Sequence, residues 1–170
     1  MSIAAQLLPE FDQETAALRS ALERAADAHL AWRPHAKSMT LGGLCTHLAN
    51  TLTWTERILN TTELDLAPAG APPYKLEELR TRAAILSAFD HNRAAARAAL
   101  SAAPDAAFAV PWTLLAGGKP IFTLPRGVCL RSFVLSHMIH HRGQLTVYLR
   151  LCGLPVPSIY GPSADEGQLG

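Results

Sequence analysis

Residues 136–145, SHMIHHRGQL, place His137, His140 and His141 within an otherwise apolar helical pattern. Four residues advance an α-helix by about 400°, so His137 and His141 point only about 40° apart and lie one turn from each other. Their imidazoles can therefore converge on one metal ion. His140 is rotated by about 60° from His137 and by about 100° from His141, which directs it toward the flank of the helix.

The histidine pair belongs to a longer apolar stripe that predicts a helix beginning near Pro125 and closed by Gly153. The residues of this stripe share one helical face: Leu130, Val134, His137, His141, Gln144, Tyr148 and Cys152. Before it, residues 108–125 contain two β-prone runs on either side of Gly117 and Gly118, which predict a hairpin or an irregular crossover. This is the one region where we expect strands. After it, residues 153–170 are rich in Pro, Gly and Ser and predict an extended, partly packed tail.

Three further amphipathic patterns precede the hairpin region. The first predicts a helix over residues 3–30, ended by Pro34. The second begins after a cap at Thr40 and continues to about residue 60, and the third covers about Lys75 to Leu100, with many alanines. Together with the last helix, these patterns predict an all-α fold: an antiparallel four-helix bundle that forms a single domain over residues 1–170.

Composition excludes several classes of protein. Fifteen Lys and Arg against fourteen Asp and Glu give a net charge of +1 without a basic stripe, so we expect no nucleic-acid partner. The N-terminal segment lacks the basic and apolar regions of a secretory signal, and no stretch has transmembrane length, so no membrane association is expected. Three widely spaced cysteines, Cys45, Cys129 and Cys152, form no CxxC motif. They indicate no disulfide framework and favour a cytoplasmic location.

The second helix offers a third imidazole. His47 lies in its apolar stripe between Leu44 and Thr51 and can face the His137 and His141 pair from across the bundle. Two imidazoles alone chelate weakly, whereas three can hold a divalent ion. Spacing leaves two interpretations open: a three-histidine metal site, or buried neutral imidazoles with hydrogen-bond partners.

Other polar residues near this stripe also have two interpretations. Gln144 and Tyr148 either line a pocket beside the histidines or pack in the core. His140 and Arg142 either orient the metal ligands or make dimer contacts, unless they are simply exposed. Asp165 and Glu166 in the tail are expected to remain in solvent.

Two long segments carry a family resemblance. Residues 37–59, KSMTLGGLCTHLANTLTWTERIL, and residues 111–166, which contain HMIHHRGQL, resemble the DinB/YfiT-like superfamily of metalloenzymes. In that superfamily a four-helix bundle holds a divalent ion, commonly nickel or zinc, through one histidine of the second helix and an HxxxH pair of the last long helix. The resemblance therefore implies His47, His137 and His141 as metal ligands. Iron or copper can also bind three histidines, and no catalytic residue is assigned.

The resemblance also implies an activity. Three neutral imidazoles leave a coordination position open, as in catalytic rather than closed structural sites. Relatives include transferases and isomerases that use low-molecular-weight thiols such as bacillithiol or mycothiol. We therefore expect a thiol-dependent S-transferase acting on an electrophilic substrate, or a related metal-assisted hydrolase. The alternative is a non-catalytic, metal-binding homodimer that serves as a stress-response or sensor module. An open pocket beside the ion would favour the enzyme, and a fourth protein ligand would favour the alternative.

Overall fold

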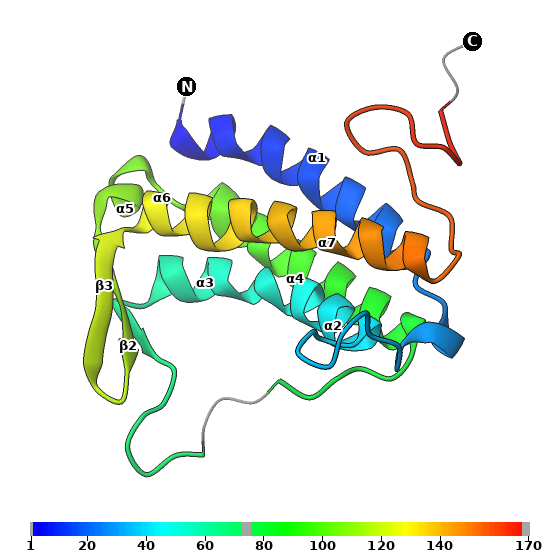
Figure 1. Ribbon diagram of the computed structural model, residues 1–170. Coiled ribbons are helices and arrows are strands. Elements are labelled where there is room, and N and C mark those ends of the chain that lie inside the picture. Colours follow the sequence, from blue (N-terminus) through cyan, green and yellow to red (C-terminus); the bar gives the residue numbers. More distant parts are fainter. Residues whose placement is uncertain (1, 73–75, 168–170) are drawn as a thin grey trace.

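The computed structural model describes residues 2–72 and 76–167 of the chain, which are mostly helical (Figure 1). The helices are α1 (Ile3–Glu23), α2 (Leu41–Thr51), α3 (Thr53–Asn60), α4 (Arg82–Ala102), α5 (Asp105–Ala109), α6 (Arg126–Cys129) and α7 (His137–Leu151). A 3-10 turn, η1 (Asp27–His29), follows α1, and a π-helical segment, η2 (Leu130–Ser136), joins α6 to α7. The strands are β1 (Glu63–Asp65), β2 (Pro111–Ala116) and β3 (Lys119–Pro125).

The long helices surround one apolar core. α1 packs on α4 and α7, and α2 packs on the same two helices (Figure 1). Each helix contributes side chains that are fully buried, among them Phe11, Leu18, Leu44, Leu48, Phe89, Leu145 and Leu149. On α7, however, the buried residues Met138, Leu145 and Leu149 lie beside the predicted stripe, whose residues His137, His141, Gln144 and Tyr148 are only half-buried.

A small three-stranded sheet lies at one end of the helices, so the fold is mostly helical rather than all-α. β2 pairs antiparallel with β3, and β1 pairs parallel with β2. The predicted hairpin is confirmed, since Gly117 and Gly118 have φ of 60° and 74°, the positive values that a tight type I′ turn requires. β1 was not predicted. The Asp65 carboxylate at its end accepts hydrogen bonds from the amides of Gly117 and Gly118, and so holds the hairpin tip against β1.

Two predicted helices are shorter or broken in the structure. α1 ends at Glu23 rather than near residue 30, and the Asp27 carboxylate then accepts a hydrogen bond from the Arg82 amide at the start of α4. The predicted helix from Thr40 to residue 60 is divided at Leu52 into α2 and α3. The hydroxyls of Thr51 and Thr53 bond back to carbonyls of the preceding turn there, which bends a helix.

The remaining boundaries follow from caps. Thr81 caps α4 by accepting a hydrogen bond from the Ala84 amide, so this helix begins after Leu76 and Leu79. The predicted start of the helix, Lys75, lies outside the described residues. The last helical run is continuous from Arg126 to Leu151, and Gly153, with φ of 70°, follows its end as predicted. Among residues 2–72 and 76–167, no helix is long and apolar enough to cross a lipid bilayer.

The described part of the C-terminal tail packs against α1 and α7, which agrees with the predicted partly packed tail. Asp165 pairs with Arg150 of α7, and Glu166 pairs with Arg24, just after α1. Both carboxylates therefore hold the tail and not the histidine cluster. As expected, Asp165 remains exposed, whereas Glu166 is half-buried in its ion pair.

A buried ion pair joins α1 to α7. Arg142 is only 2% exposed, and its Nη1 lies 2.7 Å from Glu14 Oε2 and donates to the Glu14 carbonyl oxygen at 3.0 Å. The hydroxyl of Tyr160, in the tail, donates to the Glu14 carboxylate at 2.7 Å and accepts from Arg142. Both terminal nitrogens of Arg142 and the Oε2 atom of Glu14 thus have partners, which a buried charge requires.

This pair predicts a large difference between two neighbouring glutamates. Glu14→Ala leaves a buried guanidinium without its carboxylate, and we expect it to lower the free energy of unfolding by about 3–5 kcal/mol. Glu10→Ala, one turn earlier, is the matched control, because Glu10 pairs with Arg131 at the surface and should contribute about 0–1 kcal/mol. Urea denaturation at pH 7 measures both. Equal losses for the two variants would contradict a special role of the buried pair.

Candidate metal centre

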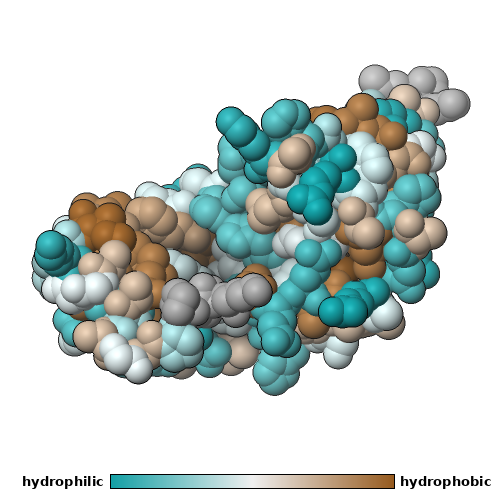
Figure 2. Space-filling model, turned by 60° about the horizontal axis from the view of Figure 1, so that its bottom comes forward, coloured by the Kyte–Doolittle hydropathy of each residue, from teal (hydrophilic) through white to brown (hydrophobic). Residues whose placement is uncertain are grey.

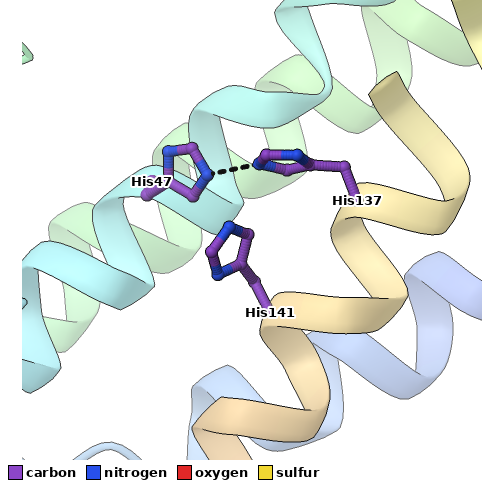
Figure 3. Close-up of side chains that lie close together, drawn as sticks. All are labelled: His47, His137 and His141. Atoms are coloured by element: carbon purple, nitrogen blue, oxygen red, sulfur yellow. Dashed lines mark hydrogen bonds between the residues drawn. The ribbon is translucent and has the colours of Figure 1, made fainter. Parts of the chain in front are cut away.

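Three imidazoles from two neighbouring helices meet at one point. His47 of α2 faces His137 and His141 of α7, and the ligand nitrogens of all three lie within 4.8 Å of one another (Figure 3). The Nε2 atoms of His47 and His137 are 2.8 Å apart. Ring centroids in the cluster are separated by 4.5–5.0 Å. The structure therefore brings together the three residues selected from helical spacing.

Local sequence places each ring. Thr40 caps α2 by accepting a hydrogen bond from the Gly43 amide, which starts the helix fewer than two turns before His47. On the other side, His137 is the first residue of α7 after η2, and His141 follows one regular turn later. Because α2 packs directly on α7, the three rings project into the space between these two helices.

Gln144 orients His141. Its side-chain oxygen lies 2.7 Å from His141 Nδ1, so this nitrogen carries the proton and Nε2 is left with its lone pair. The amide nitrogen of Gln144 reaches His140 Nε2 at 3.1 Å. His140 itself is exposed on the flank of α7, as predicted. Such a partner on the second ring nitrogen is typical of histidines that bind metals, and the sequence interpretation did not assign this role to Gln144.

Burial and mutual repulsion keep the cluster uncharged. Burial, followed by the charges of His141 and His137, lowers the pKa of His47 from 6.5 to about 4. Burial is also the main cause that lowers the pKa of His137 and of His141; for His141 the hydrogen bond with Gln144 acts in the opposite direction. The three imidazoles are therefore neutral at pH 7, the state in which histidine binds a metal ion.

These residues fit a divalent ion in both donor type and spacing. Three neutral nitrogens at this separation match the ligand set of an open zinc or nickel site. Within the described ranges, no other His, Cys, Asp or Glu joins the cluster to close it. Cys45, two residues before His47, is fully buried on another face of α2, and burial raises the pKa of its thiol to about 12.

A small pocket adjoins the cluster on the side of the hairpin. It has a volume of about 90 Å³ and is lined by Thr51, Trp54 and Phe133 together with His47 and His137. Trp112 is fully buried behind Trp54, with ring centroids 6.3 Å apart. The cluster thus has an open neighbour rather than a fourth protein ligand.

Arg142 and Glu56 lie away from the site. Arg142 points toward α1 in the buried ion pair, so it orients none of the three histidines through a hydrogen bond. Glu56 is exposed on α3, in a groove shared with alanines of α4. Tyr148 donates a long hydrogen bond, 3.4 Å, to the Met39 carbonyl and packs edge-on against Trp32. Of the accessory residues considered from sequence, Gln144 and His140 are the two that connect to the cluster.

The fold and the cluster define a class of protein: a mostly helical domain with a three-histidine group that could bind a metal ion. The chain belongs to the DinB family, whose pattern matches residues 1–168. A 43-residue segment is 51% identical to the uncharacterized protein YrdA of Bacillus subtilis. This match covers 25% of this chain and 25% of YrdA.

Solved structures share the fold. A DinB-like protein from Bacillus cereus superposes with a TM-score of 0.66 at 23% identity, covering 90% of this chain and 95% of the other. The DinB-like protein YjoA from Bacillus subtilis superposes with a TM-score of 0.69 at 17% identity, covering 91% and 96%. At these identities the likeness concerns the fold alone.

The lowered pKa values predict an acid-sensitive fold in metal-free protein. The folded state binds fewer protons than the unfolded state below pH 6.5, so the stability due to neutral His47 is complete above about 6.5 and is lost as pH falls toward 4. We expect the urea midpoint, measured with chelator present, to fall between pH 7 and pH 5, where most carboxylates stay ionised. His47→Gln should reduce this slope, and His91→Ala, an exposed control, should not. A midpoint independent of pH would contradict the prediction.

Proposed function

We propose that His47, His137 and His141 bind one divalent metal ion, nickel or zinc first, and that the protein is a metal-dependent enzyme. The observation that supports this proposal is the convergence of three ligand nitrogens within 4.8 Å on rings that are neutral at pH 7. Neutral imidazoles gain little by facing one another without a metal, because even their half-burial removes polar nitrogen atoms from water at a cost. A shared cation satisfies their lone pairs.

The reaction that best suits this site is thiol S-transfer, with metal-assisted hydrolysis as the related possibility. An ion held by three neutral imidazoles would supply a Lewis acid with an open position, able to lower the pKa of a bound thiol or water. In the transfer, the thiol proton passes to solvent and the sulfur bonds to the electrophilic carbon. The leaving group departs with the electron pair of the bond that breaks.

The residues around the cluster have separate tasks in this proposal. Gln144 holds the His141 ring in the tautomer that presents Nε2 to the cluster. Thr51, Trp54 and Phe133 exclude water on the hairpin side. The open pocket supports an enzyme over a non-catalytic sensor, whose ion would be closed by a fourth ligand.

Three further parts of the proposal concern the setting of the site. The helices form an antiparallel four-helix bundle in this proposal, which carries the ligands on rigid elements. Its four members are α1, the pair α2 and α3, α4, and the run from α6 to α7. We propose a homodimer in the cytoplasm as the working form. A low-molecular-weight thiol and an electrophilic small molecule are the proposed substrates.

Elemental analysis of purified protein tests the metal site. We expect about one divalent ion per chain in the native protein and in His91→Ala, and loss of the ion in His47→Ala, because two imidazoles chelate weakly. Chelator should lower the melting temperature of the native protein and leave that of His47→Ala nearly unchanged, since an ion bound to the folded state stabilises it by mass action. Equal metal content in native protein and His47→Ala would rule out the three-histidine site.

A direct activity assay tests the reaction. Metal-loaded protein is incubated with bacillithiol or mycothiol and a panel of alkyl halides, epoxides and activated esters, and products are identified by mass spectrometry. We expect thioether or hydrolysis products with native protein and at least about tenfold less with His47→Ala, a loss equivalent to about 1.4 kcal/mol of transition-state stabilisation. A fully loaded protein that forms no product with any member of the panel would favour the sensor over the enzyme.

A further inference from the structure

The candidate site has opposite chemical character at its two ends. The hairpin side of the cluster begins with the aromatic ring of Phe133 on η2, and the other side continues along α7 with the polar side chains of His140 and Gln144. Trp54 faces the pocket from α3, again on the hairpin side. A ligand that spans the cluster would therefore meet an apolar wall at one end and hydrogen-bonding groups at the other.

The apolar wall is fixed from behind by the sheet. The ring of Phe133 stacks on Phe122 of β3, with centroids 4.6 Å apart and planes 5° apart. Trp112 of β2 supports both Trp54 and Phe122, each at 6.3 Å, and its indole nitrogen donates to Thr61 Oγ1 at 3.2 Å. Figure 2 shows hydrophobic residues gathered over this hairpin end of the molecule. The pocket is thus preformed rather than assembled by loops.

The size and lining of the pocket restrict what can enter it. A volume of about 90 Å³ equals that of about three water molecules, which corresponds to a chain of about three or four carbon atoms. Apart from the two imidazoles, its lining offers Thr51, Trp54 and Phe133 and no charged side chain. The Thr51 hydroxyl already donates to the His47 carbonyl at 2.9 Å, so it does not require a ligand as its acceptor.

We infer that this pocket binds the short apolar group of the electrophilic substrate, an alkyl group of about three or four carbons, next to the ion. The inference rests on the proposed function and names its substrate class. The thiol would lie toward His140 and Gln144, because bacillithiol and mycothiol both carry sugar hydroxyls that need hydrogen-bond partners. Apolar and polar reactants would thus approach the same ion from opposite ends of the site.

A first experiment probes the pocket in metal-free protein. Native protein is titrated with 1-propanol and with ethylene glycol, which have equal numbers of heavy atoms, and contacts are recorded by NMR. We expect nuclear Overhauser effects from 1-propanol to the Trp54 indole and the Thr51 methyl group, and none from ethylene glycol. Contacts of 1-propanol only elsewhere on the surface would overturn the inference whether or not the protein binds a metal.

A second experiment measures the preference beside a bound ion. Cobalt-loaded protein is titrated with propanethiol and with 2-mercaptoethanol, and thiolate-to-cobalt charge transfer reports binding. We expect propanethiol to bind about tenfold more tightly, because its terminal carbons lose contact with water and a hydroxyl in the same place would lose its partners. Affinity should rise from ethanethiol to butanethiol and then level off as longer chains reach solvent.

Variants of Phe133 separate the pocket from the metal site. Phe133→Ala should remove most of the preference for propanethiol over 2-mercaptoethanol. Phe133→Trp should fill the pocket and lower the affinity for both thiols. Val147→Ala, an exposed position on α7, is the control. The comparison requires that native protein and all variants bind cobalt. If native protein then binds propanethiol and 2-mercaptoethanol with equal affinity, the pocket inference is overturned. Failure of the native protein to bind cobalt would instead overturn the proposed function, and the NMR titration would then decide the pocket on its own.

Discussion

The rotation of α7 about its axis decides whether the histidines face one another, and the Arg142 to Glu14 pair helps to fix this rotation together with the buried side chains of Met138, Leu145 and Leu149. Arg142 lies about 100° around the helix from His141. With its guanidinium held by the carboxylate and the carbonyl of Glu14 on α1, His137 and His141 turn toward α2. A buried ion pair contributes little net stability, but it penalises every arrangement in which either charge lacks its partner. Tyr160 adds a third contact, so the tail supports the same orientation.

Helical spacing was sufficient to predict the three-histidine cluster because the relevant segments stay regular. The π-helical segment ends at Ser136, so the turn that relates His137 to His141 is an ordinary α-helical one. The break at Leu52 comes after His47 and leaves its face unchanged. Features fixed by local backbone chemistry were equally predictable, above all the tight turn at Gly117 and Gly118.

Features that depend on distant partners were not predictable. Arg142 occupies a polar position in the sequence pattern, and only Glu14, 128 residues earlier, makes its burial possible. β1 has three residues and no alternating pattern; it exists because it pairs with β2 and because Asp65 binds the hairpin amides. Gln144 was placed correctly on the histidine face, but its role depends on a side-chain rotamer. A period of 3.6 residues specifies a direction and not a hydrogen bond.

The pattern of donors and acceptors within the cluster explains why a cation suits it better than hydrogen bonds alone. His141 donates its Nδ1 proton to Gln144, so the nitrogen that Figure 3 shows directed toward the other two rings is an acceptor. The bond between His47 Nε2 and His137 Nε2 uses one proton and one lone pair. At least two lone pairs therefore converge on one small volume, and a single proton cannot satisfy both. Protonating a ring is opposed by burial, which lowers the pKa of all three. A divalent ion would accept every lone pair at once and keep each ring neutral, and so would give all three imidazoles a partner.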